Sequence, residues 1–369
     1  MKKITYTLLV IVIAVFLFGC KKNGSNGDEV INPFDENDNV VTVTPESTPT
    51  EEPATPTPAE VSHEGEMRSF LTGLWVPVEI GTKRPYAIQL NNFKTVSNQW
   101  GISQADIVYE CIVEGGITRL LGIGENFTSD KIGSVRSARH YFVSIADEYN
   151  AIYIHYGGAK YAYDKIKKIG IDEIDGMSGI GGSVFFRDKS IKAPNNAFTS
   201  LEGLSKGVEK KKFETSYKEG YSSHFSFYEE DMDLSSDKQA NKLKIYFSAY
   251  TAPTFEYSAA DKQYLANQFG GPHKDSNTGA QLAFKNIIIQ FVKEWDIDKN
   301  HYQTMDLENA SGKGLYITNG KMVPITWQKN ESKKWMRYYN EAGEELTINP
   351  GKTYIALFPN NRIGDVTLE

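Results

Sequence analysis

The hydrophobic pattern divides the chain into an apolar N-terminal run, a long polar stretch and a remainder with strand and helix periodicity. The first run, Ile4 to Phe18, contains 15 residues without a charge and follows Lys2 and Lys3. A helix of that length is too short to cross the hydrocarbon core of a bilayer, which needs about 20 residues. A positive start followed by a short apolar run predicts an export signal over residues 1–19.

The residues that end this run indicate the kind of signal. Gly19 lies directly before Cys20, and the peptidase that processes lipoproteins needs a small residue beside the cysteine that receives the lipid. We therefore expect lipidation of Cys20 and attachment to the membrane through its acyl chains. A retained apolar anchor with an unmodified Cys20 is the alternative. Either arrangement places the folded part on the extracytoplasmic face of a bacterial cell membrane.

The polar stretch over residues 20–68 predicts a tether. It has few large apolar side chains and includes a run rich in Pro, Thr and Glu over residues 44–58. Such a segment cannot bury enough apolar surface to offset its ordering entropy, so we expect it to be disordered. A coil of this length reaches roughly 35–40 Å, which lets the folded part lie away from the lipid.

Residues 69–212 alternate between strand and helix patterns, which predicts an α/β unit. Strands are expected over 85–92, 105–114, 117–123 and 151–156, and helices over 137–149, over 159–169 and from residue 200. The pair Gly115-Gly116 predicts a two-residue hairpin loop. That loop would pair Ile112 with Arg119 and place Arg119 on the same face as Glu110 and Glu114.

A cluster of basic residues accompanies the helix predicted over 137–149. Ser137 is the expected N-cap, and Arg136, Arg139 and His140 would crowd the first turn. Basic residues at a helix N-terminus need compensation because the helix dipole is already positive there. One interpretation is a site for a phosphate or carboxylate ligand. The other is internal pairing with Glu110, Glu114 or Asp147, since structural ion pairs often resemble functional sites.

Polar residues near the strand ends are the remaining candidates for a cleft. They are Asn91, Asn92, Glu110, Glu114, Arg119, His155, Lys160 and Arg187. Glu110 and Glu114 would stand about 13 Å apart on one strand, whereas paired glycosidase carboxylates are at most about 9.5 Å apart. A cross-strand ion cluster with Arg119 is therefore favoured over acid and base catalysis. A histidine such as His155 is more often a hydrogen-bonded core residue than a catalytic one.

After a connector over 213–240, residues 241–360 show strand alternation separated by turn residues, which predicts a mostly antiparallel β unit. Asn319-Gly320 marks the clearest hairpin. Four aromatic residues in this unit could form a glycan-stacking surface, although core packing explains them equally well. They are Trp327, Trp335, Tyr338 and Tyr339.

Charge and motif content exclude several classes of function. The net charge is −7, and loss of Lys2 and Lys3 with the signal makes it −9, which disfavours a nucleic-acid partner. The sequence contains no HExxH, CxxC, phosphate-loop or G-x-S-x-G pattern, so no metal, cofactor or catalytic residue is assigned. With Cys20 lipidated, Cys111 has no intrachain partner, and its place in an apolar run indicates a buried structural thiol.

Several long motifs resemble those of the YerB-like family of bacterial lipoproteins, which pair two domains of unknown function. The motifs include residues 102–110, 114–119, 132–139 and 192–196, together with Gly312-Lys313-Gly314, Trp327 and Asn349-Pro350-Gly351-Lys352. The resemblance implies a three-layer β-β-α sandwich for the N-terminal unit and brings no established activity. The family pattern often has His where this chain has Phe93 and Asn195, which weakens any scheme that uses those two histidines.

Three functions are compatible with these observations. The first is a non-catalytic envelope protein that binds an anionic wall polymer, a peptidoglycan carboxylate or an envelope protein through Arg136, Arg139 and nearby groups. The second is an envelope hydrolase or transferase that uses His155 as a general base with Glu110 or Glu114. The third is an interaction scaffold whose arginines are structural. The absence of catalytic motifs favours the first and third.

Overall fold

The computed structural model describes residues 62–96, 98–330 and 333–369. The predicted signal, Cys20 and most of the predicted tether lie outside these residues. The tether was expected to continue to residue 68, but Glu66–Arg68 form strand β1, which pairs with β2 (Trp75–Pro77). His63 also stacks on Trp75 with ring centroids 3.8 Å apart. The predicted boundary at residue 68 is therefore too late, because a three-residue strand is too short to appear as a periodic pattern.

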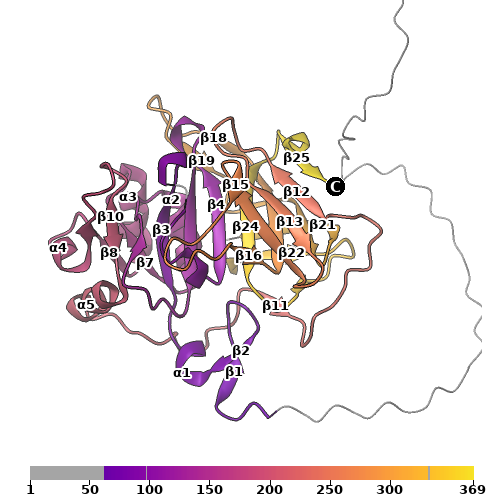
Figure 1. Cartoon of the computed structure of the whole chain (residues 1–369), viewed down its shortest axis with the longest axis horizontal. Helices are drawn as coiled ribbons and strands as arrows, with labels where there is room; N and C mark the ends of the chain where they lie inside the picture. Colours follow the sequence, from indigo (N-terminus) through magenta and orange to yellow (C-terminus); the bar gives the residue numbers. More distant parts are fainter. Residues whose placement is uncertain (1–61, 97, 331–332) are drawn as a thin grey trace, which may run out of the picture. The chain divides into compact units, whose positions relative to one another are not determined.

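A ten-stranded mixed sheet is the centre of the fold (Figure 1). β24 is parallel to both of its neighbours, and β7 is parallel to β3 and to β8, while the other pairs are antiparallel. In spatial order the strands are β22 (Lys333–Tyr339), β21 (Lys321–Asn330), β20 (Ala310–Thr318), β17 (Asn286–Val292), β24 (Thr353–Pro359), β4 (Ile107–Ile112), β5 (Thr118–Gly124), β3 (Tyr86–Asn92), β7 (Ile152–His155) and β8 (Glu173–Asp175).

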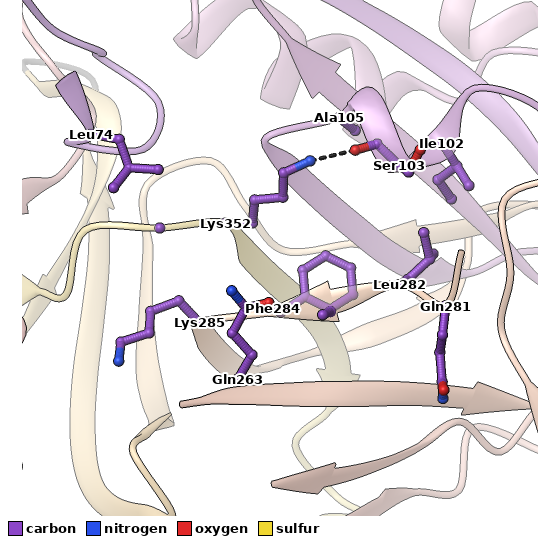
Figure 2. A pocket seen from close by; sticks show the side chains of 12 residues that line it. Leu74, Ile102, Ser103, Ala105, Gln263, Gln281, Leu282, Phe284, Lys285 and Lys352 are labelled. Carbon is purple, nitrogen blue, oxygen red and sulfur yellow. Dashed lines mark hydrogen bonds between the residues drawn. The ribbon is translucent and has the colours of Figure 1, made fainter. Parts of the chain in front are cut away.

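This sheet joins the two segments that the sequence divides at residues 213–240. β24 of the C-terminal segment pairs with β4 of the N-terminal segment over five residues, from Thr353 opposite Ile107 to Leu357 opposite Cys111. Beside this junction, Lys352 donates a hydrogen bond from Nζ to the backbone oxygen of Ser103 (Figure 2). The two segments therefore share one sheet, and their folding as separate domains stays a prediction.

A second, antiparallel sheet is built by the C-terminal segment. Its strands are β15 (Gly271–Pro272), β14 (Gln263–Gln268), β13 (Thr254–Ser258), β12 (Lys242–Ile245) and β25 (Val366–Leu368), and β16 (Ala283–Phe284) also pairs with β14. It packs on one face of the large sheet, where the rings of Phe255 and Phe284 lie 4.7 and 5.5 Å from that of Tyr354. The fold is thus mixed α/β, with a large mixed sheet and a C-terminal antiparallel sheet.

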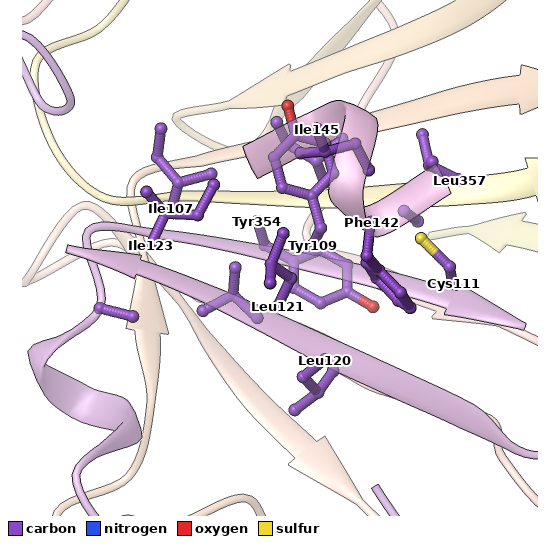
Figure 3. Packing of buried hydrophobic residues seen from close by; sticks show 14 of the residues in the cluster. Ile107, Tyr109, Cys111, Leu120, Leu121, Ile123, Phe142, Ile145, Tyr354 and Leu357 are labelled. Carbon is purple, nitrogen blue, oxygen red and sulfur yellow. The ribbon is translucent and has the colours of Figure 1, made fainter. Parts of the chain in front are cut away.

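The opposite face of the large sheet carries helix α2 (His140–Glu148), which contacts α3 (Lys160–Ile169). Figure 3 shows Phe142 and Ile145 of α2 packed among residues of β4 and β5. The apolar stripe predicted for this helix is confirmed, since Phe142, Ile145 and Tyr149 are buried, and Tyr149 bonds Tyr109 through their hydroxyls at 2.8 Å. The predicted burial of Cys111 is also confirmed.

Shorter elements complete the described chain. The helices are α1 (Val78–Gly81), α4 (Gly181–Val184) and α5 (Leu201–Lys211), with single 3-10 turns at Lys94–Val96, Ile102–Gln104, Glu114–Gly116 and Ile363–Asp365. The strands are β6 (Ile132–Gly133), β9 (Phe186–Arg187), β10 (Ala197–Thr199), β11 (Ser226–Phe227), β18 (Glu294–Asp296), β19 (Gln303–Met305) and β23 (Thr347–Ile348). Among the residues that the structure describes, no helix has the length and apolar character needed to cross a membrane.

The two hairpin predictions have different outcomes. Asn319-Gly320 does join β20 to β21, with φ of 50° and 75°, as a turn with both central residues left-handed requires. The register predicted from Gly115-Gly116 is wrong. Glu114–Gly116 form a three-residue turn, so Ile112 pairs with Thr118 and Cys111 pairs with Arg119. A shift of one residue moves a side chain to the other face, which places Arg119 on the helix-covered face and leaves Glu110 on the opposite face.

Candidate functional site

Three arginines gather on the helix-covered face of the large sheet, near the loop between β4 and β5. We call Arg119, Arg136, Arg139 and the nearby Glu114 the arginine cluster. Arg119 belongs to β5, and Arg136 belongs to a short extended segment that follows β6 and runs beside β3. Two backbone hydrogen bonds fix this segment, from Asn91 N to Ser134 O at 2.9 Å and from Arg136 N to Gln89 O at 2.8 Å.

Arg139 is paired inside the chain. Its Nε lies 2.8 and 3.0 Å from the two carboxylate oxygens of Glu114, and its terminal nitrogen also bonds this carboxylate. Burial alone would raise the pKa of Glu114, but the hydrogen bonds and charge of Arg139 and the charge of Arg119 hold it below its usual value. The internal-pairing interpretation is therefore confirmed for Arg139, with Glu114 as its partner.

The helix begins later than the sequence suggests. α2 starts at His140, so its N-cap is Arg139, which makes no side-chain capping bond. The prediction of Ser137 as N-cap is wrong, because the Ser137 hydroxyl donates to the backbone oxygen of Tyr156 at 3.2 Å. His140 bonds Thr304 through Nε2 at 2.7 Å, and burial together with the charges of Lys165 and Arg139 lowers its pKa to about 4. Arg136 and Ser137 thus precede the helix.

Arg119 and Arg136 lack the carboxylate that Arg139 has. Arg119 is 6% exposed and donates from Nη1 to the backbone oxygen of Ser137 at 2.5 Å. Burial and the positive charges of Arg139 and Arg136 lower its pKa to about 9. Arg136 donates from Nη1 to the Pro194 oxygen at 3.0 Å, and burial and Arg139 also lower its pKa. Among the described residues, Glu114 is the one carboxylate among the main causes of the pKa shifts of these three arginines, so the cluster carries a surplus of positive charge.

Buried hydrogen-bonding groups without partners surround the same point. Within the described chain, Asn91 Nδ2, Ser134 Oγ and Arg136 Nε are buried and make no hydrogen bond. Asn91 lies opposite Arg119 in the ladder between β3 and β5, and Ser134 runs beside Asn91 on the other edge of β3. Residues opposite one another across a ladder share a face of the sheet. The ladder positions therefore place these three residues on the helix-covered face of the sheet, which also carries Arg119.

The carboxylate of Glu110 belongs to a separate network on the opposite face. It accepts hydrogen bonds from Thr118 Oγ1 at 2.6 Å, from Asn92 Nδ2 at 3.0 Å and from the Tyr354 hydroxyl at 2.7 Å. Burial raises the pKa of Glu110 to about 7, although these three hydrogen bonds oppose the shift. The expected ion cluster of Glu110, Glu114 and Arg119 is thus reduced to Glu114 and Arg119, because the corrected register places Glu110 across the sheet.

The other predicted cleft residues have partners outside the cluster. His155 is completely buried, with Nδ1 2.8 Å from the Gly157 oxygen and Nε2 3.1 Å from the Glu173 carboxylate. It shares its face with Gln89 and not with Glu110, so the sheet separates it from Glu110. Glu114, the other carboxylate of the catalytic hypothesis, pairs with Arg139. Lys160 pairs with Asp164 at the surface, and Arg187 donates to Asn196 Oδ1 at 2.7 Å and lies over the Tyr156 ring.

Sequence reasoning did not identify Ser134 as a site residue. Its position depends on the pairing of Val135 with Leu90, which no local pattern indicates. Two of the four aromatic residues of the suggested glycan surface, Trp327 and Tyr338, are better explained by packing, since both are buried and bond Phe291 O and Gln290 Oε1. In the part of the chain that the structure describes, no group of three or more His, Cys, Asp or Glu residues could hold a metal ion.

A cavity of about 300 Å³ lies where Lys352 and Ser103 meet β14 and β16 (Figure 2). Its two lysines already have partners. Lys352 bonds Ser103, and Lys285 lies 2.5 Å from the Asp231 carboxylate, with its ammonium directed away from Lys352. This cavity is therefore a weaker candidate for an anion-binding site than the arginine cluster is.

Comparison with known proteins defines the class of protein. The model of the N-terminal domain of a protein of unknown function, DUF3048, matches residues 71–214, and the model of its C-terminal domain matches residues 243–355. The chain belongs to this two-domain family, which confirms the resemblance seen in its motifs.

A particular relative and its crystal structure support the assignment. The chain is 29% identical over 297 residues to "Putative lipoprotein YerB" of Bacillus subtilis (strain 168), which covers 80% of this chain and 87% of the relative. It is similar to the crystal structure of the YerB protein from Bacillus subtilis, with a TM-score of 0.74 and 26% identity over 82% of this chain and 99% of that one. Neither name states an activity.

Proposed function

We propose that this protein is a lipid-anchored lipoprotein of the bacterial envelope whose folded part binds an anionic ligand at the arginine cluster. The observation that carries the proposal is that Arg136 Nε and Asn91 Nδ2 are both buried without a hydrogen-bond partner within the described chain, near a cluster with more guanidinium groups than carboxylates. This region would bind an oxyanion. A phosphate-rich wall polymer, a peptidoglycan carboxylate and an acidic protein partner each carry one.

The energetic argument rests on unsatisfied donors. A buried donor without an acceptor costs roughly 1–3 kcal/mol, and more when it is charged. Arg119 and Arg136 also repel Arg139, which lowers the pKa of both. A single bound oxyanion would accept from Asn91 and Arg136 and neutralise part of the charge, and oxyanions suit the fixed donor geometry of guanidinium. An anion bound at the cluster would therefore bond these donors and reduce the repulsion between the guanidinium groups.

The proposed location rests on the N-terminal sequence and on the name of the Bacillus subtilis relative. The short apolar run that ends at Gly19-Cys20 is the pattern of a lipoprotein signal. Fractionation of cells that express the whole chain tests this part. The wild type should be in the membrane fraction, and Cys20→Ala should lose its lipid and its signal processing. An unchanged mass and membrane content in Cys20→Ala would contradict lipidation.

Thermal unfolding in phosphate tests the binding. At ten times the dissociation constant, a ligand that binds only the folded state adds about 1.4 kcal/mol to the free energy of unfolding. We expect phosphate to raise the melting temperature of the wild type more than chloride of equal ionic strength. Arg136→Gln should lose this difference, while the matched control Lys244→Gln, which removes an exposed positive charge, should keep it.

The scaffold alternative makes a different prediction. If the arginines serve only the fold, as Arg139 does through Glu114, Arg136→Gln should lower the melting temperature in chloride and in phosphate equally. Under the binding proposal, Arg136→Gln should be as stable as the wild type in chloride, because the variant removes a repelled and incompletely bonded charge. Under the binding proposal the wild type and Arg136→Gln should therefore differ in melting temperature in phosphate but not in chloride, whereas the scaffold alternative predicts the same difference in both salts.

A further inference from the structure

A second cavity lies on the other face of the large sheet, where the end of β3 approaches the antiparallel sheet. Its volume is about 540 Å³, within the range of roughly 300–1,000 Å³ of small-molecule sites. Asn92, Phe93 and Lys94 line it from the β3 side, and Tyr250, Thr251 and Phe269 line it from the C-terminal segment. We call it the β3 cavity. None of the groups of the arginine cluster lines it.

Aromatic side chains are exposed at this cavity. Tyr250 is 63% exposed and Phe93 is 37% exposed, although both are large and apolar over most of their surface. Exposed rings at a concave surface favour ligands that offer a flat apolar face. The ring hydrogens of a pyranose form such a face.

The polar groups of the cavity are held in place and incompletely bonded. Thr251 is 2% exposed, and its hydroxyl has no hydrogen-bond partner among the described residues. The Asn92 side chain is fixed because its Nδ2 donates to Glu110 and to Thr118 Oγ1. Within the described chain, its Oδ1 accepts one long hydrogen bond, from Gln99 Nε2 at 3.4 Å. A hydroxyl and an amide oxygen are therefore available to a ligand with hydroxyl groups.

The charge of the lining argues against an ionic ligand. Lys94 is the single charged residue among the residues that line the cavity, and no carboxylate lines it. A cation would find no counter-charge, and a polyanion would find one exposed ammonium. The combination of exposed aromatic faces, a hydroxyl and an amide fits an uncharged polyhydroxylated ligand best.

We propose that the β3 cavity binds an uncharged saccharide of one or two rings, with a sugar face on Tyr250 or Phe93 and a sugar hydroxyl at Thr251 Oγ1. This site is independent of the proposed anion site, since the two lie on opposite faces of the sheet. No covalent step is involved.

Saturation-transfer NMR of the full folded protein with cellobiose, maltose and N,N′-diacetylchitobiose tests the proposal. At least one of these disaccharides should receive saturation at its ring protons from the wild type. Tyr250→Ala should reduce that transfer at least fivefold, whereas Tyr246→Ala, which removes an exposed tyrosine outside the lining, should leave it unchanged. Arg136→Gln should also leave it unchanged, which separates this site from the anion site.

Thr251→Val gives a second test that does not depend on removing a ring. The change keeps the shape of the side chain and removes the unbonded hydroxyl, so the melting temperature should stay equal or rise while saturation transfer falls. Absence of transfer from all three disaccharides would overturn the proposal. Transfer that persists equally in Tyr250→Ala and Thr251→Val would overturn it as well, because the sugar would then bind elsewhere.

Discussion

Asn91 and Asn92 are consecutive residues of β3, and their side chains leave the sheet on opposite faces. Asn91 lies opposite Arg119 and has an unbonded Nδ2 beside the arginine cluster, whereas Asn92 donates to Glu110 and lines the β3 cavity. This follows from the alternation of side chains along a strand. The end of β3 therefore contributes side chains to both proposed sites. Gln99 Nε2 donates a hydrogen bond to the backbone oxygen of Asn91 at 2.7 Å and stabilises this strand end.

The pairing of Glu114 with Arg139 predicts the effect of losing the one carboxylate of the cluster. Glu114→Gln would leave three guanidinium groups without an opposite charge, so we expect a loss of roughly 1–3 kcal/mol in the free energy of unfolding at low ionic strength. Urea denaturation measures this loss. Phosphate should restore more of the lost stability than chloride does, because the cluster without the charge of Glu114 would attract an oxyanion more strongly.

Asp147→Asn is the control for charge removal near the same helix, since Asp147 is exposed and its charge acts on Lys329. A Glu114→Gln variant as stable as the wild type, with no gain from phosphate, would contradict the account of the cluster as strongly positive.

Glu110 predicts a pH dependence of stability. Its pKa is about 7 in the folded protein and about 4.5 when exposed, so the folded state binds more protons between these values. The contribution of Glu110 to stability is therefore greatest below pH 4.5 and falls as the pH rises to 7. Glu110→Gln should abolish this pH-dependent loss of stability, because glutamine does not titrate. Relative to wild type, the variant should gain about 3 kcal/mol in the free energy of unfolding between pH 4.5 and pH 8.

Urea denaturation at pH 4.5, 6 and 8 measures that difference. Glu125 has a pKa that burial also raises to about 7, so the wild-type profile alone does not isolate Glu110, whereas the difference between the two proteins does. Glu256→Gln controls for loss of an exposed carboxylate. A difference between Glu110→Gln and wild type that stays constant with pH would show that Glu110 does not titrate in this range.

The shared sheet predicts that the N-terminal segment needs the C-terminal one. Residues 62–240 alone would leave β4 without β24 and would expose the face that Tyr354, Phe255 and Phe284 cover. An unpaired central strand favours aggregation. We expect this piece to lack a cooperative unfolding transition and to regain it when produced together with residues 241–369. Cooperative unfolding of the isolated piece would instead support two independent domains.

Local patterns in the sequence predict most of the single elements. The strands at Tyr86–Asn92 and Ile107–Ile112 and the buried stripe of α2 agree with periodicity within a few residues. What local patterns do not contain is pairing between distant segments. The parallel pair of β24 and β4 joins residues about 245 positions apart, and the extra residue in the turn at Glu114–Gly116 reverses the face of Arg119 without altering the apolar pattern.

The candidate site, like the fold, is predictable from the sequence only where local patterns determine it. Arg136 and Arg139 are identifiable from the sequence because they were expected at the N-terminal end of a predicted helix, where basic residues need compensation. Which of them is paired depends on where Glu114 lies after the turn, and the role of Ser134 depends on its contact with β3. The β3 cavity likewise forms where two distant segments, one with Phe93 and one with Tyr250, approach each other. Neither segment alone therefore contains a pattern that would predict it.

The most direct test of the anion site observes the unbonded atom itself. The Nε–H signal of Arg136, assigned by its loss in Arg136→Gln, can be followed by nitrogen-detected NMR while phosphate is added. We predict a saturable shift of this signal, with no saturable shift for Arg68, whose guanidinium already bonds the Gly73 and Glu229 oxygens. An Arg136 signal that does not move in phosphate, or that moves equally in chloride, would contradict binding at the cluster.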